Sequence, residues 1–175
     1  MSVSAPRLRI SGQVIVWTSL LTGTLDGLAA VINQYIVVRF FPANPGHPGV
    51  PHPERIFQFI ASTVFGPITM LKVSYAWYGL VFHYLIAYCF TSFFLILYPR
   101  LPLLRANWWV VGAGYGAFIW TVMNVVVLPL VVGNTPIQKW AYTPAGALLA
   151  AAILMVAIGL PTAFIAQKTV RSDPV

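Results

Sequence analysis

The chain has 175 residues, of which 59% are hydrophobic and only 7% are charged. A soluble domain carries roughly 25% charged residues and has a large surface relative to its volume, so this composition excludes a soluble globular protein. The net charge of +7 does not indicate nucleic-acid binding, because the Lys and Arg residues are scattered at the ends of apolar runs and form no stripe. We therefore expect the lipid bilayer as the main partner, other membrane-protein subunits as a further partner, and no nucleic acid.

The first apolar run predicts a transmembrane helix over residues 13–38, since about 20 apolar residues span a bilayer. Five prolines follow in residues 42–53, where they prevent a helix. The next apolar segment, residues 55–65, is too short to cross a bilayer and ends at Gly66-Pro67. It predicts a short interfacial or re-entrant helix, which we place at the outer face of the membrane.

Three further apolar runs predict transmembrane helices over residues 73–98, 108–132 and 144–166. Pro99 closes the first of these runs, and Pro144 fits the first position of the last one, where proline is favoured. The sequence therefore predicts an all-α fold, an integral membrane bundle of four transmembrane helices with one short interfacial or re-entrant helix. We treat residues 1–175 as a single transmembrane domain.

The loop cations predict how this bundle is oriented. Cytoplasmic loops of membrane proteins are enriched in Lys and Arg, and the side with both termini holds six such residues against four on the other side. This asymmetry favours both termini in the cytoplasm. The six are Arg7, Arg9, Arg100, Arg105, Lys168 and Arg171, and the four are Arg39, Arg55, Lys72 and Lys139.

Asp26 lies near the middle of the first predicted helix, where an ionisable group costs a few kcal/mol and normally faces the bundle interior or a watery cavity. Two interpretations stay open. Asp26 is a proton, ion or ligand site, or it is a protonated or hydrogen-bonded carboxyl that locks helix packing.

Two more polar residues extend this candidate intramembrane cluster. His83 lies within the second transmembrane helix and is either a packed, hydrogen-bonded side chain or a partner of Asp26 at similar depth. Asn124 lies in the third, on the same face as Trp120 and Thr121, where it bonds a neighbouring helix or joins the cluster. Pro129 lies five residues further on and frees backbone carbonyls.

Small residues at spacings of four predict close helix contacts. Gly23 and Gly27 flank Asp26 in the first helix, and Gly112 and Gly116 repeat the spacing in the third. Such pairs let two backbones approach. We interpret them as helix-packing faces within the bundle rather than as a dimer interface.

The sequence lacks the motifs of common enzymes. It has no phosphate-binding loop, dinucleotide-binding glycine pattern, zinc-binding HExxH helix or GxSxG elbow. Its only acidic residues are Asp26, Glu54 and Asp173. The single cysteine, Cys89, excludes an internal disulfide and is interpreted as a small buried hydrophobe. We expect no catalytic residue, no metal site, no cofactor and no enzymatic activity.

The chain contains five motifs in order, the segments Gly23–Ala30, Phe59–Ser62 with Phe65-Gly66, Phe82–Ala87, Met123–Leu130 and Gly159–Ala163. Together they resemble a family of small, uncharacterised bacterial inner-membrane proteins. More distantly, the chain is similar to the YagU-like family, which is associated with acid resistance. The resemblance implies a multi-pass fold in the bacterial inner (plasma) membrane and no established activity.

Three function classes follow from these features. The first is a small accessory, interaction or stress-related protein of the inner membrane, which fits the sparse polar chemistry and the small-residue packing faces. The second is a small transporter or channel that uses Asp26, His83 and Asn124 as an internal polar path. The third, an intramembrane enzyme, has the least support, because a second acid near Asp26 is missing from the predicted helices.

Overall fold

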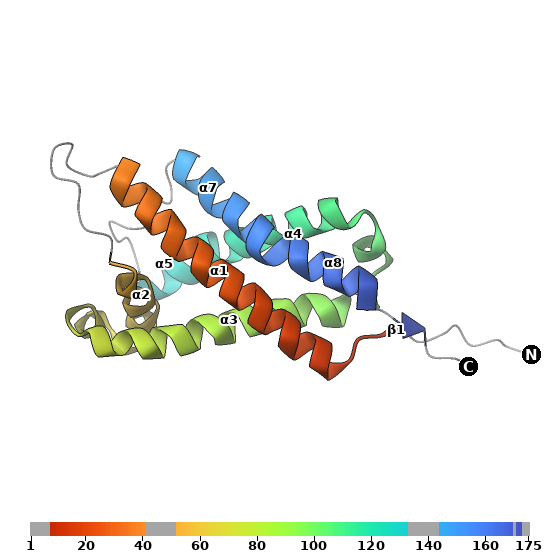
Figure 1. The fold of residues 1–175 in the computed structure, drawn as a ribbon, viewed down its shortest axis with the longest axis horizontal. Helices are drawn as coiled ribbons and strands as arrows, with labels where there is room; N and C mark the ends of the chain where they lie inside the picture. Colours follow the sequence, from red (N-terminus) through yellow and green to blue (C-terminus); the bar gives the residue numbers. More distant parts are fainter. Residues whose placement is uncertain (1–7, 41–51, 133–143, 170, 173–175) are drawn as a thin grey trace, which may run out of the picture.

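Within residues 8–40, 52–132, 144–169 and 171–172, which the computed structural model describes, four long apolar helices are each able to span a membrane (Figure 1). The apolar spans are Gly12–Ile36, Val73–Leu97, Trp108–Val131 and Pro144–Thr169. They lie side by side as a bundle, and a short helix lies at one end of it. The predicted all-α membrane bundle is thus confirmed.

We call the four membrane-spanning helical segments rods. In two of them a π-helical turn, which is wider than an α-helical turn, interrupts the helix. The first rod is α1 (Gly12–Phe40), and the second is the short 3-10 helix η2 (Val73–Tyr75) followed by α3 (Ala76–Leu97). The third consists of α4 (Trp108–Thr121), the π-helix η4 (Val122–Val127) and α5 (Leu128–Val132). The fourth consists of α7 (Pro144–Leu154), the π-helix η5 (Met155–Gly159) and α8 (Leu160–Thr169).

Both π-helices end two residues before a proline, Pro129 in α5 and Pro161 in α8. Proline has no amide hydrogen and its ring crowds the preceding turn, so the usual bond to the fourth residue back cannot form. The helix widens instead. The Leu128 amide donates to the carbonyl of Met123, and the Leu160 amide to that of Met155, each five residues back.

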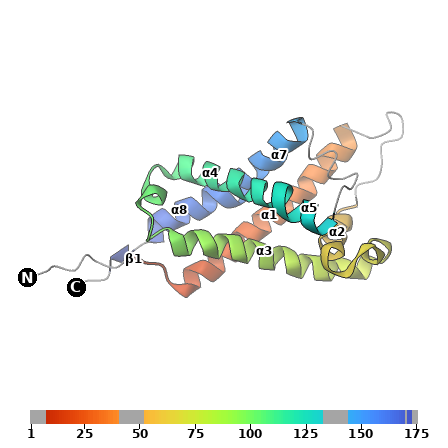
Figure 2. The ribbon, with the colours of Figure 1, turned by 180° about the vertical axis from the view of Figure 1, so that it is seen from behind.

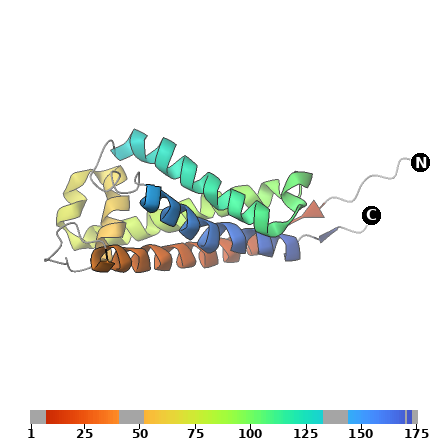
Figure 3. The ribbon, with the colours of Figure 1, turned by 90° about the horizontal axis from the view of Figure 1, so that it is seen from above.

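The short helix α2 (Glu54–Phe65) lies across the direction of the four spans (Figure 3). It ends at Gly66, whose φ of 79° lies in the left-handed region that favours glycine. The chain then turns into the 3-10 helix η1 (Pro67–Leu71). Gln58 and Thr69 tie η1 to α2 through two side-chain bonds to each other's carbonyls, of 3.1 and 3.2 Å. Most of the predicted proline-rich connection, residues 42–51, lies outside the described residues.

The two ends of the bundle differ. The short strands β1 (Leu8–Arg9) and β2 (Arg171–Ser172) pair antiparallel, so both termini leave from one end, opposite α2 (Figures 1 and 2). The connection between α3 and α4, which contains the 3-10 helix η3 (Pro102–Arg105), lies at the terminal end as well. This arrangement places Arg100 and Arg105 on the side predicted for them.

The buried core joins α3, α4, η5 and α8 through side chains such as Phe94, Leu95, Ile119 and Ile158. Outward-facing side chains are also apolar, and Leu130 and Leu148 are 81% and 72% exposed. Such surfaces are favourable in lipid and costly in water. The protein is therefore a small multi-pass membrane protein.

The interpretation of Cys89 as a buried residue is wrong. Its side chain is exposed on the surface of α3. A thiol that faces hydrocarbon costs little, because it behaves as a small hydrophobe whether it contacts protein or lipid. In a membrane span, apolar character therefore does not predict which face is buried.

Candidate functional site

One face of α1 carries polar side chains along most of its length. Ser19, Thr22, Asp26 and Asn33 follow each other at spacings of three, four and seven residues, which repeat on one side of an α-helix. Ser19 and Thr22 are 3% and 0% exposed. This face therefore points into the bundle, and α3 packs against this part of α1.

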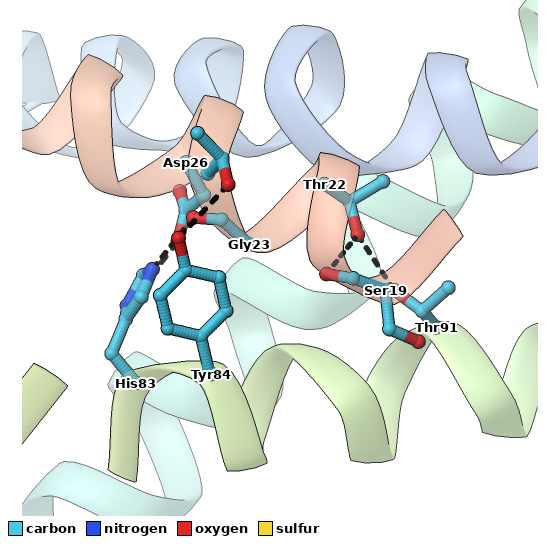
Figure 4. A network of polar contacts seen from close by, with 8 residues as sticks. Ser19, Thr22, Gly23, Asp26, His83, Tyr84 and Thr91 are labelled. Carbon is cyan, nitrogen blue, oxygen red and sulfur yellow. Dashed lines mark hydrogen bonds and ion pairs between the residues drawn. The ribbon is translucent and has the colours of Figure 1, made fainter. Parts of the chain in front are cut away.

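His83 of α3 reaches the backbone of α1 because two glycines leave room for it. Its ring nitrogen Nε2 lies 2.8 Å from the carbonyl oxygen of Gly23. A Cβ at Gly27 would lie 3.2 Å from the same nitrogen, and a Cβ at Gly23 would lie 2.9 Å from the ring of Tyr84. The sequence had marked both glycines as packing positions, and the structure places Gly27 opposite His83 and Gly23 opposite Tyr84. Figure 4 shows Gly23 beside these two side chains.

The bond to Gly23 fixes which nitrogen of His83 faces Asp26. A carbonyl oxygen only accepts hydrogen bonds, so Nε2 carries a hydrogen and donates it. The other nitrogen, Nδ1, lies 4.0 Å from Oδ2 of Asp26. The side chains of His83 and Asp26 are only 10% and 19% exposed. The structure thus brings together two of the three residues of the predicted polar cluster.

This geometry gives the pair one shared proton position. With one proton between Nδ1 and Oδ2, the pair is either a neutral acid beside a neutral imidazole or a carboxylate beside an imidazolium, and both have no net charge. Removing that proton or adding a second one leaves a net charge in an apolar interior, which is costly. The separation of 4.0 Å is within reach of an ion pair and is longer than a direct hydrogen bond. The arrangement therefore holds one proton, and any change in the number of protons changes the net charge between α1 and α3.

Aromatic rings surround His83. Phe57 of α2 meets the imidazole edge-on with ring centroids 5.9 Å apart, and Tyr84 does so at 5.7 Å. Because Phe57 comes from the transverse helix, α2 covers the histidine from the end of the bundle opposite the termini. The rings of Phe57 and Tyr84 exclude water from the parts of the imidazole that they contact. They therefore raise the cost of an unpaired charge on His83.

Hydroxyl groups form a second set of contacts between α1 and α3, and the sequence analysis missed them. Thr22 and Thr91 share a hydrogen bond of 2.9 Å between their hydroxyls (Figure 4). Thr24 and Tyr84 share another of the same length. Thr22 also bonds the carbonyls of Thr18 and Ser19. The signal that could have found them is the helical spacing of polar residues along α1.

The buried bond between Thr22 and Thr91 gives a test of the α1–α3 contact. Thr22→Val should destabilise the protein by about 0.6–1.7 kcal/mol, because Thr91 then keeps a buried hydroxyl without its partner. Adding Thr91→Val should cost less than the sum of the two single changes. Thermal unfolding in mild detergent measures this. Thr121→Val removes an exposed hydroxyl bonded only to the Ala117 carbonyl and serves as the control. Additive effects of the two Val variants would contradict the contact.

Asn124 and the second glycine pair lie elsewhere in the bundle. The side chain of Asn124 is half-buried in η4 and donates to the carbonyl of Trp120, 2.9 Å away. Its membership of the Asp26–His83 cluster stays a prediction. Gly112 and Gly116 of α4 face the backbone of η5 and the start of α8, where a Cβ on Gly112 would lie 2.9 Å from the carbonyl oxygen of Gly159.

A smaller polar group joins the end of α1 to the start of α2. Gln34 of α1 donates to the carbonyl of His52 at 3.0 Å, and His52 Nδ1 lies 2.9 Å from Oε1 of Glu54. The side chains of His52 and Glu54 are 44% and 32% exposed. A backbone hydrogen bond at the start of α2 and the bond to His52 hold the pKa of Glu54 below its ordinary value of 4.5.

Glu54 should make the attachment of α2 sensitive to strong acid. Because its pKa is lower in the folded protein, its contribution to stability is complete above about pH 4.5 and is lost as the pH falls through the lowered value. Thermal unfolding should therefore show a loss below about pH 4.5 that Glu54→Gln reduces. Lys72→Gln changes a charge at the same end and should leave the loss intact. An unchanged profile in Glu54→Gln would contradict the role of this carboxylate.

No group of three His, Cys, Asp or Glu side chains that could hold a metal ion occurs among the residues that the structure describes. Comparisons of the chain with protein-family models, curated proteins and solved structures found no match. The family resemblance of the motifs therefore stays a prediction. The function is inferred from the site itself.

Proposed function

We propose that this protein is a non-enzymatic accessory protein of the bacterial inner membrane whose helix packing responds to acid. The observation that carries the proposal is the contact between Asp26 and His83, whose facing atoms are 4.0 Å apart in a largely buried position. Because Gly23 fixes the histidine tautomer, the proton that changes with pH lies at the junction of α1 and α3. A change in its occupancy alters the charge between the two helices and hence their packing.

Two further features support this function. The motif resemblance to small inner-membrane proteins, and distantly to an acid-resistance family, fits a stress-related role. The excess of Lys and Arg on the terminal side favours cytoplasmic termini, and α2 then lies at the outer face. The exposed large apolar side chains of the four spans fit association with other membrane subunits, which would respond to the change in packing.

A double-mutant cycle on Asp26 and His83 tests the proposal. Asp26→Asn, His83→Gln and the double variant are compared by thermal unfolding in mild detergent at about pH 5 and about pH 8. We expect a coupling of at least about 0.5 kcal/mol that differs between the two pH values, because the proton count of the pair changes between them. Additive effects at both pH values would contradict the proposal.

A third variant tests whether Asp26 makes a specific polar contact with His83. Asp26→Leu should destabilise the protein more than Asp26→Asn, because asparagine keeps the ability to hydrogen-bond in this position beside His83 and leucine does not. Equal stability of these two variants would show that the carboxyl of Asp26 makes no specific contact.

A small transporter or channel is the second candidate, and the polar face of α1 favours it. A row of polar groups through a membrane helix is what a proton or ion path requires. Flux measured with pure protein in liposomes, together with the search for a stable partner after mild extraction, distinguishes the two. A proton flux abolished by Asp26→Asn favours transport, and a co-purifying subunit without flux favours the accessory role.

A further inference from the structure

We propose that the Asp26–His83 pair exchanges its proton with one side of the membrane only, through a hydrated passage along α1 that opens beside α2. This inference rests on the proton-binding role proposed above and adds the direction from which protons arrive. The inference follows from a difference between the two halves of α1: buried polar atoms lack hydrogen-bond partners on the half near α2 and have them on the half near the termini.

On the α2 side, two amide oxygens of α1 are buried and lack donors. Asn33 lies seven residues after Asp26, which is about two turns or 10 Å along the same face. Its Oδ1 atom and the Oε1 atom of Gln34 are buried, and no residue that the structure describes donates a hydrogen bond to them. Buried polar atoms of this kind are normally satisfied by water. We infer that water reaches both oxygens.

These oxygens connect to groups in contact with solvent. The amide nitrogen of Gln34 donates to the carbonyl of His52, and His52 contacts Glu54. Both of those side chains are partly exposed. A proton taken up at His52 or Glu54 therefore has polar groups along its way past Gln34 and Asn33 towards Asp26. Water molecules between them would complete the path.

On the terminal side, the same face of α1 is closed. Thr22 is fully buried, and its hydroxyl is already bonded to Thr91 and to two carbonyls of α1. Ser19 is 3% exposed and donates to the carbonyl of Ile15 at 2.8 Å. Phe94 and Leu95 are 1% and 0% exposed and fill the core at this level of α3. Among the residues that the structure describes, no buried side-chain oxygen or nitrogen on this half of the α1 face lacks a hydrogen-bond partner.

The other buried polar atoms without partners lie outside this face. They belong to Ser92 of α3 and Trp120 of α4. The ionisable side chains near the route are His83 and Tyr84 of α3, Glu54 and Arg55 of α2, and His52. The helices α7, η5 and α8 also pack against α1. The first two carry no ionisable residue, and α8 carries Lys168 in its last turn, at the terminal end of the bundle. The proton route is therefore confined to the α2 end.

Ser19 and Asn33 offer a matched test because each lies seven residues from Asp26 on the same face. Each is changed to cysteine in a Cys89→Ser background, and the protein is placed in vesicles. A charged, membrane-impermeant thiosulfonate is added to one side at a time. We expect Asn33→Cys to react from the α2 side at least about tenfold faster than Ser19→Cys from either side, because only a hydrated thiol ionises and reacts. Asn33→Cys that reacts no faster than Ser19→Cys would overturn the passage.

Two exposed positions report the orientation of the vesicles. Leu71 in η1 and Leu103 in η3 lie at opposite ends, and each is 79% exposed. Leu71→Cys should react from the same side as Asn33→Cys, and Leu103→Cys from the other. Reaction of Asn33→Cys from the Leu103 side would overturn the inference.

A second measurement uses the unchanged protein. With only three acidic side chains, the infrared carboxyl band of Asp26 can be identified by its loss in Asp26→Asn. We expect the band to change when the pH is shifted on the α2 side and to stay constant when it is shifted on the terminal side. A response to the terminal side would overturn the passage and leave the proposed function intact. No response to either side would overturn both, since the pair would then not exchange protons.

Discussion

Replacing Gly116 by alanine is expected to destabilise the protein by about 3 kcal/mol or more, because the added methyl group has no space. A Cβ on Gly116 would lie 2.3 Å from the Cα and 2.5 Å from the amide nitrogen of Met155. Both atoms belong to the backbone of η5, so no flexible side chain can move aside. The helices α4 and η5 would have to separate. This would also break the contact between Gly112 and Gly159, where a Cβ on either glycine would lie too close to the carbonyl oxygen of the other.

Gly114 provides a matched control two residues earlier on the same helix. It is exposed, and a Cβ there would meet no atom within 4 Å. Gly114→Ala should therefore leave the stability unchanged within about 1 kcal/mol, the difference in helix propensity. Thermal unfolding of both variants in mild detergent gives the comparison. If Gly116→Ala is as stable as Gly114→Ala, the backbones of α4 and η5 do not meet at this point.

The lengths of the membrane helices could be predicted from the sequence because apolar runs and prolines bound them. The observed helices begin and end within three residues of the predicted ones, and Pro144 starts α7 as expected. The rule behind this success is simple, since a bilayer of fixed thickness requires about 20 apolar residues per crossing. That residues 1–175 form a single domain stays a prediction.

The partners of each helix could not be predicted in the same way. Apart from the spaced polar residues of α1, the faces of the four spans are largely apolar, so hydrophobicity alone does not distinguish a protein-facing from a lipid-facing surface, as the exposed Cys89 shows. The glycine spacing indicated where helices approach but not which ones. In the structure Gly23 and Gly27 face α3, whereas Gly112 and Gly116 face the fourth rod.

Part of the candidate site could also be predicted from the sequence. Equal depth in two antiparallel helices made the approach of Asp26 to His83 a reasonable hypothesis, and the two lie 4.0 Å apart. The bond from His83 to the carbonyl of Gly23 had no sequence signal, because every residue has a carbonyl. The Thr22–Thr91 bond had a weak sequence signal, which is the helical spacing of polar residues along α1. This signal appears only when the polar residues of α1 are considered together.

The close contacts and the polar contacts occur together in this bundle. Helix association in lipid depends on packing and interhelical hydrogen bonds rather than on hydrophobic exclusion of water. Where Gly23 and Gly27 let α3 approach, His83 reaches the α1 backbone and Asp26. The same principle applies to α2, whose Phe57 covers His83 only because α2 lies directly on a glycine of α3.

Gly79→Ala should therefore push α2 away from α3 and uncover His83. A Cβ at Gly79 would lie 1.7 Å from the carbonyl oxygen and 2.4 Å from the carbonyl carbon of Phe57, and neither atom can move without the helix. We expect a loss of about 3 kcal/mol or more in stability. The local effect can be followed at Ala61 of α2, which is 0% exposed. In a Cys89→Ser background, Ala61→Cys should react slowly with a water-soluble thiol reagent and at least about tenfold faster once Gly79→Ala is added.

The control for this measurement is Gly114→Ala in the same Ala61→Cys background, since the exposed Gly114 has no neighbour to displace. Its labelling rate should equal that of the background. Thermal unfolding distinguishes local detachment of α2 from loss of the whole fold. If the four spans still unfold cooperatively while Ala61→Cys reacts quickly, α2 alone has moved, and its cover over the Asp26–His83 pair depends on the absence of a single methyl group at Gly79. Slow labelling in Gly79→Ala would show that α2 does not rest on this glycine.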